Sequence, residues 1–125
     1  MKKARTLSES FYYAISGILY AFRTQRNIKI HFATALLVIL MSYLLKLSTL
    51  EILTVFMTIT IVLVTEMINT AIETVVDMYT QEYHPLAAVA KNVAAGAVLI
   101  SAINAIVVGY IVFYKRILML LSLSK

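Results

Sequence analysis

Four polar side chains near the middle of the chain recur at helical spacing. Glu66, Asn69, Glu73 and Asp77 are separated by steps of 3, 4 and 4 residues, which places them within a sector of roughly 80° on one helix face. The preceding segment, residues 52–65, is largely apolar and uncharged. Adjacent carboxylates repel one another and are costly in apolar surroundings. The stripe therefore implies a divalent cation, a lysine or a proton beside it.

These groups suit phosphoryl transfer, which depends on positioning and charge neutralisation more than on covalent chemistry. Glu66 and Glu73 are two turns apart, so one helix presents a base at lipid depth and a metal ligand nearer the water. Mg²⁺ favours a few carboxylates together with substrate phosphates, and Lys91 can offer a point charge to a phosphate. An ion pathway and a purely structural polar network are the alternatives that the spacing leaves open.

Several other site types are excluded by motif. The chain has no G-x-x-x-x-G-K-[ST] pattern and contains only 3 glycines, which rules out a soluble P-loop or protein-kinase architecture. It has no cysteine, and its two histidines lie far apart in the sequence. No thiolate or zinc-type metal site is therefore expected.

The composition is that of a membrane protein. Apolar residues make up 62% of the 125 residues and charged residues 14%, against about 45–50% and about 25% in soluble domains. The length corresponds to a single domain, residues 1–125. A net charge of +5 indicates membrane topology and attraction to anionic lipid. No basic patch interleaved with exposed aromatics supports a nucleic-acid partner.

We expect an all-α integral membrane fold with an N-terminal amphipathic surface helix and three transmembrane helices. The surface helix covers about 7–26, where apolar side chains recur at helical spacing and basic residues flank both ends. The spans cover about 28–46, 50–77 and 86–114. Residues 78–90 are expected to form the extended loop between the last two, and Pro85 suits the first turn of the last helix.

The distribution of Lys and Arg predicts the orientation in the membrane. Seven basic residues lie on the N-terminal side, namely Lys2, Lys3, Arg5, Arg23, Arg26, Lys29 and Lys91, and four lie on the other, namely Lys46, Lys115, Arg116 and Lys125. This bias favours a cytoplasmic N-terminus. The acidic stripe then lies at the cytoplasmic face, where ATP and Mg²⁺ are available.

The motif residues also carry a family resemblance. The pattern E-x-x-N-[ST]-A-I-E-x-x-x-D from Glu66 to Asp77, followed by Glu82-Tyr83-His84, Ala90-Lys91 and the small residues of 94–99, resembles the small prokaryotic membrane diacylglycerol kinases. It is most similar to their Gram-positive undecaprenol kinase branch, with which residues 21–27 and His31 also agree. The resemblance covers about residues 10–113.

This resemblance implies a bacterial inner-membrane homotrimer that uses MgATP to phosphorylate the hydroxyl of a membrane lipid, with active sites shared between subunits at the cytoplasmic interface. Carried over by position, Glu66 is the general base, Glu73 holds Mg²⁺ and contacts the nucleotide, and Asn69 orders the site. The other residues expected to contact the nucleotide are Tyr13 (against the adenine), Glu82, Tyr83, His84, Lys91 and Asn92.

Two positions depart from the family pattern. The family often has Lys-Asp where this chain has Lys91-Asn92, and Gln25 stands where a second metal-binding Glu is expected. A glutamine offers one carbonyl oxygen and no charge. Mg²⁺ binding is therefore expected to depend on Glu73 and the ATP phosphates.

The resemblance favours undecaprenol kinase activity, which converts undecaprenol to undecaprenyl phosphate. A diacylglycerol kinase that makes phosphatidic acid is the alternative within the same class. A non-enzymatic holin-like pore or proton pathway is the alternative of another class. The clustering of polar residues at one membrane face argues against it, because a pore needs them along the whole crossing.

Overall fold

A computed structural model describes residues 6–123 of the chain, with side chains as far as residue 118. Within this range the chain is helical and contains no strand. The helices are α1 (Leu7–Thr24), α2 (Arg26–Leu44), α3 (Thr49–Tyr79) and α4 (Pro85–Leu123). The all-α fold class predicted from the sequence is confirmed.

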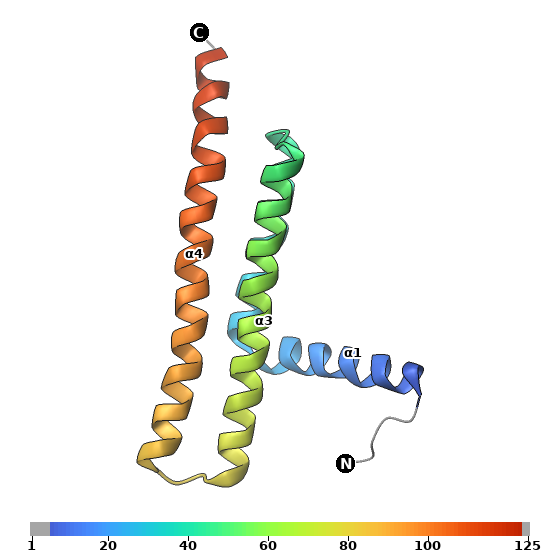
Figure 1. Ribbon diagram of the computed structural model, residues 1–125, viewed down its shortest axis with the longest axis vertical. Coiled ribbons are helices and arrows are strands. Elements are labelled where there is room, and N and C mark those ends of the chain that lie inside the picture. Colours follow the sequence, from blue (N-terminus) through green and yellow to red (C-terminus); the bar gives the residue numbers. More distant parts are fainter. Residues whose placement is uncertain (1–5, 124–125) are drawn as a thin grey trace.

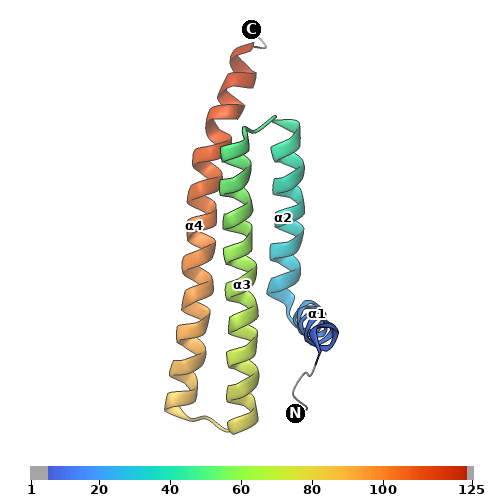
Figure 2. The same ribbon diagram turned by 45° about the vertical axis from the view of Figure 1, so that its right-hand side comes forward.

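The helices α2, α3 and α4 run side by side in alternating directions, whereas α1 lies across the bundle where α2 begins (Figures 1 and 2). The central helix is α3, which packs against each of the other three. Its contact with α4 is the most extensive, and α2 does not pack directly on α4 in the described part of the chain. The acidic stripe is therefore carried by the helix that all the others touch.

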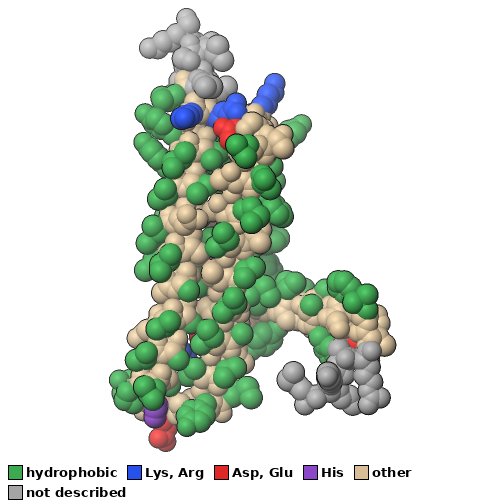
Figure 3. Space-filling model, in the orientation of Figure 1, with side chains coloured by type: hydrophobic (Ala, Val, Ile, Leu, Met, Phe, Trp, Pro, Cys, Tyr) green, Lys and Arg blue, Asp and Glu red, His purple; other side chains and the backbone are tan. Residues whose placement is uncertain are grey.

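Three of these helices, α2, α3 and α4, are long and apolar enough to cross a membrane. Figure 3 shows hydrophobic side chains covering the shaft of the bundle, with Lys, Arg and acidic side chains at its upper end and acidic and His side chains at its lower end. This distribution matches a bilayer, where the shaft meets lipid and the ends meet water. The chain is thus a membrane protein with three spanning helices.

Side-chain caps define where two of the helices begin. Thr6 and Glu9 form a capping box at the start of α1, and Ser48 and Glu51 form another at the start of α3. In such a box each side chain accepts a hydrogen bond from the backbone N–H of the other residue, which satisfies two otherwise free donors. The two helices therefore begin at positions fixed by local sequence.

The break between α1 and α2 is a single residue, Gln25. Its backbone is extended, with φ −97° and ψ 122°, and its N–H donates to the carbonyl of Ala21 at 2.9 Å. At the other end of the bundle, α3 continues to Tyr79 and α4 begins at Pro85. The connection is therefore shorter than the predicted 78–90 range, because Pro85 starts the new helix at once.

The α3–α4 contact depends on small and hydroxyl side chains. Ala94 and Ser101 are each 5% exposed, and the hydroxyls of Thr65 and Ser101 lie 2.9 Å apart across the contact. Near the other end, Arg116 of α4 binds the carboxylate of Glu51 with two of its nitrogens. Small residues allow two helix backbones to approach closely within a membrane, and the ion pair fixes their register.

We expect Ala94→Leu to lower the free energy of unfolding by about 1–3 kcal/mol, because the larger side chain does not fit the buried α3–α4 contact. Ala97→Leu is the matched control, since Ala97 is exposed on the same helix; its effect should stay within about 0.5 kcal/mol. Unfolding in mixed micelles, followed by circular dichroism, measures both. Equal destabilisation by the two variants would contradict this packing.

Candidate active site

The polar stripe of α3 runs from the interior of the bundle to its end. Glu66 is 2% exposed and Asn69 is also buried, whereas Glu73 is half-buried and Asp77 is exposed. Glu66 is the most deeply buried charged side chain among the described residues. One helix face thus presents acidic groups in graded environments, from apolar to aqueous.

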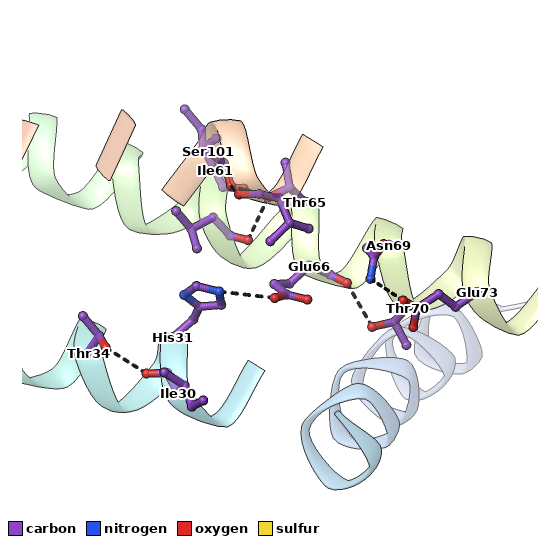
Figure 4. A network of polar contacts seen from close by, with 12 residues as sticks. Ile30, His31, Thr34, Ile61, Thr65, Glu66, Asn69, Thr70, Glu73 and Ser101 are labelled. Carbon is purple, nitrogen blue, oxygen red and sulfur yellow. Dashed lines mark hydrogen bonds and ion pairs between the residues drawn. The ribbon is translucent and has the colours of Figure 1, made fainter. Parts of the chain in front are cut away.

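The carboxylate of Glu66 faces a histidine on the neighbouring span. Nε2 of His31, in the second turn of α2, lies 3.2 Å from Oε1 of Glu66 (Figure 4). The distance is that of an ion pair, but Oε1 has no hydrogen-bond partner in the described structure and keeps an unused acceptor site. Buried polar atoms are nearly always bonded, and an exception calls for an explanation such as a ligand.

Asn69 and Glu73 form the next part of the stripe. The Asn69 amide nitrogen donates to Oε1 of Glu73 at 3.0 Å, which leaves the Asn69 carbonyl oxygen buried without a partner in the described structure. Thr70, between them, bonds the backbone carbonyl of Glu66. Two buried acceptor oxygens, on Glu66 and Asn69, therefore remain available one turn apart on the same helix.

Lys91 is paired with the last acid of the stripe. Its Nζ contacts Oδ1 of Asp77 from the first turns of α4, and both side chains are partly exposed. The structure therefore places Lys91 near the water-facing end of the stripe and pairs it with Asp77. The neighbouring residue, Asn92, is exposed on α4.

The remaining predicted site residues lie outside this line of contacts. Glu82, Tyr83 and His84 are exposed in the connection between α3 and α4, where Thr80 bonds the backbone of Glu82. Tyr13 is exposed on α1, in edge-to-face contact with Tyr12. In the part of the chain that the structure describes, no hydrogen bond or ion pair joins these side chains to Glu66, Asn69 or Glu73.

The predicted metal position Gln25 lies at the junction of α1 and α2. Its side chain makes no capping hydrogen bond to α2. Among the described residues, no three His, Asp or Glu side chains converge on one point. The stripe nevertheless offers carboxylate and amide oxygens, two of them unbonded, and this is the donor chemistry that Mg²⁺ prefers. The residues fit a Mg²⁺ ion that takes its remaining ligands from phosphates and water.

Two hollows flank the stripe. One, of about 460 Å³, opens between α1 and the end of α3 and is bordered by Tyr20, Thr74, Asp77 and the start of the connection. The other, of about 370 Å³, is almost wholly apolar and lies between α2, α3 and α4. It opens because α2 and α4 do not pack on each other, and His31 borders it. A polar and an apolar space thus adjoin the same helix.

His31 is the site residue that the sequence analysis left without a role. His31 agrees with the pattern of the undecaprenol kinase branch, but no role in the site was predicted for it. The signal is present, because an ionisable side chain within a membrane span indicates a functional site by default. Its partner could not be identified from spacing, since the two residues are on different helices.

The sequence is similar to known proteins over most of its length. The sequence matches the family described as prokaryotic diacylglycerol kinase over residues 12–113. It is 47% identical over 107 residues to a diacylglycerol kinase of Synechocystis sp., a match that covers 85% of this chain and 61% of that protein. It is 38% identical over 109 residues to an undecaprenol kinase of Bacillus subtilis, covering 87% of this chain and 89% of that protein. The chain therefore spans less than two thirds of the first relative and most of the second.

Proposed function

The chain belongs to the prokaryotic diacylglycerol kinase family, and on that premise we propose that it uses ATP to phosphorylate a membrane lipid alcohol, with undecaprenol as the preferred acceptor. The observation that carries the proposal is the buried carboxylate of Glu66, which has an unused acceptor oxygen and lies within a membrane-spanning helix. A buried base of this kind meets a hydroxyl that arrives from the lipid.

Glu66 acts as the general base. As the acceptor hydroxyl oxygen forms its bond to the γ-phosphorus, its proton passes to the Glu66 carboxylate, and the bond from the γ-phosphorus to the bridging oxygen of ADP breaks. The burial of Glu66 keeps water, a competing acceptor, away from the reacting atoms. Asn69 orders this part of the site through its bond to Glu73.

Glu73 would hold Mg²⁺ together with the ATP phosphates, and Gln25 would add at most a neutral carbonyl oxygen. When bound, the ion would neutralise the phosphate charge. Glu73 is suited to this role because it is half-buried and one of its oxygens is already oriented by Asn69. Lys91, at the aqueous end of the stripe, offers a cation to the nucleotide.

The other nucleotide contacts are assigned to Tyr13, Glu82, Tyr83, His84 and Asn92. Within one chain these side chains are exposed and stand apart from Glu66. A homotrimer with shared active sites accounts for this separation, because a second copy can bring its surface helix or connection to the stripe. We therefore include a homotrimer in the proposal.

The site end of the bundle faces the cytoplasm of a bacterial cell in this proposal. The Lys and Arg residues near α1 and the start of α4 outnumber those at the opposite end, and such a bias favours the cytoplasmic side. ATP reaches this end from the water, whereas the acceptor arrives through the membrane.

The preference for undecaprenol is supported by the apolar hollow beside His31. Its volume of about 370 Å³ is at the low end of the range for small-ligand sites, about 300–1,000 Å³, and suits the first part of one hydrocarbon chain better than two. The name of the Synechocystis relative, a diacylglycerol kinase, supports diacylglycerol as the second candidate acceptor.

Side-by-side kinetics in one lipid-detergent mixture test the acceptor. We expect kcat/KM for undecaprenol to exceed that for diacylglycerol by about tenfold or more, a difference of about 1.4 kcal/mol in transition-state stabilisation. Transfer of labelled phosphate from ATP measures both rates, with equal mole fractions of the two alcohols. A preference for diacylglycerol would replace the first acceptor by the second, and no turnover on either would overturn the proposed activity.

A further inference from the structure

His31 borders the apolar hollow and also faces Glu66, so it stands between the two parts of the acceptor site. Of the described residues that line the hollow, it is the only ionisable one. The hydroxyls of Thr34 and Thr58, which also line it, are bonded to carbonyls of their own helices. His31 is therefore the one lining side chain whose polar contact leads to another helix.

The contact with Glu66 defines the protonation pattern of the imidazole. Nε2 lies 3.2 Å from Oε1 of Glu66, and two acceptors would repel each other at this distance. A hydrogen therefore lies between the two atoms, and Nε2 carries it when the carboxylate is ionised, as a general base must be. As a donor at this distance, Nε2–H can orient the carboxylate, and a general base needs such a fixed orientation.

Alternative partners for Glu66 are absent from the described structure. Lys91 is bound to Asp77 and Arg116 is bound to Glu51, both on other parts of α3. Asn69, one turn away, donates to Glu73. The orientation of the Glu66 carboxylate thus depends on a single side chain from α2.

We infer that His31 is a positioning residue for the acceptor site: its Nε2–H holds the Glu66 carboxylate at the end of the apolar hollow, where the hydroxyl of a lipid tail lodged there would arrive. This inference rests on the proposed kinase function. It adds a role for α2, whose other side chains at the hollow carry no charge, and it explains why the base is buried beside a hollow that a hydrocarbon tail can fill.

Three substitutions at His31 test the inference. His31→Gln keeps an N–H donor at nearly the reach of Nε2, His31→Asn places its donor one methylene short, and His31→Phe has no donor. We expect kcat to fall about 10- to 100-fold in His31→Phe and His31→Asn, because a misplaced base loses the aligned geometry. His31→Gln should stay within about threefold of the unsubstituted protein, and KM for ATP should change little in all three.

Ser42→Ala is the matched control. Ser42 is buried on the same helix, but its hydroxyl only bonds the carbonyl of Val38 at 2.7 Å. Its removal should leave kcat within about twofold of the unsubstituted protein. Circular dichroism and size-exclusion chromatography in detergent verify the fold of each variant. If His31→Phe does not fold, the comparison of His31→Gln with His31→Asn, which have the same charge, decides the question.

Equal kcat values for His31→Gln and His31→Asn would overturn the inference, as would a His31→Phe variant that is as active as Ser42→Ala. Loss of activity through a higher KM for ATP alone would also overturn it. An unsubstituted protein that shows no transfer to any lipid alcohol would instead refute the proposed function. The two failures are therefore distinguishable in one set of assays.

Discussion

Replacing Glu66 with glutamine is expected to lower kcat by about 10²- to 10⁴-fold, which is the contribution typical of a general base. The amide is nearly isosteric with the carboxylate and can still face His31, but it cannot take the hydroxyl proton. The expected loss is therefore in kcat, with KM for ATP little changed. Transfer of labelled phosphate to undecaprenol measures it.

Glu51→Gln is the charge-matched control for this experiment. Glu51 lies on the same helix, but its carboxylate caps α3 and binds Arg116 far from the stripe. This variant measures how much activity is lost when a structural carboxylate is removed. In folded preparations its kcat should stay within about twofold of that of the unsubstituted protein. A Glu66→Gln protein that is as active as Glu51→Gln would show that Glu66 only fills a polar site in the bundle.

Replacing Glu73 with glutamine is expected to raise the Mg²⁺ concentration needed for half-maximal activity by about 10- to 100-fold. The glutamine carbonyl can still accept the hydrogen bond from Asn69, so the local structure is retained while the negative charge is lost. A hard divalent cation binds a neutral amide oxygen less strongly than a carboxylate. Titration of activity with Mg²⁺ at fixed total ATP measures the change.

Asp77→Asn separates the loss of a metal ligand from the loss of any negative charge on the stripe. Asp77 lies one turn further along the same face but is paired with Lys91. Its substitution frees Lys91 and is expected to change KM for ATP, while the Mg²⁺ requirement stays within about twofold. Equal Mg²⁺ dependence in Glu73→Gln and the unsubstituted protein would contradict a metal role for Glu73.

Much of the fold follows from local sequence. The apolar segments predict three spans, and Pro85 begins α4 as expected. The family resemblance of the stripe is confirmed by the family match over residues 12–113. These features depend on neighbours along the chain, so periodicity and motif suffice to predict them.

The side-chain pairs that could not be predicted depend on contacts between helices. The spacing on α3 places Glu66, Asn69 and Glu73 on one face, but it does not reveal that His31 of α2 faces Glu66 or that Lys91 contacts Asp77. Such pairs depend on the rotation of each helix about its axis. The roles of Tyr13, Gln25 and the connection residues stay predictions, because these side chains do not meet the stripe within one chain.

The transverse course of α1 has a consequence for how the protein tolerates different bilayers. With 31 and 39 residues, α3 and α4 measure about 46 and 58 Å, well beyond the hydrocarbon core of about 30 Å. Their own lengths therefore do not determine their depth. The amphipathic helix α1, which lies along the membrane interface, determines this depth instead. Figure 4 shows α1 passing beside Thr70, next to the end of α3 that carries the site. We therefore expect hydrophobic mismatch in thin or thick membranes to be absorbed at the opposite rim, near Lys46, with the level of Glu66 relative to the headgroups kept constant.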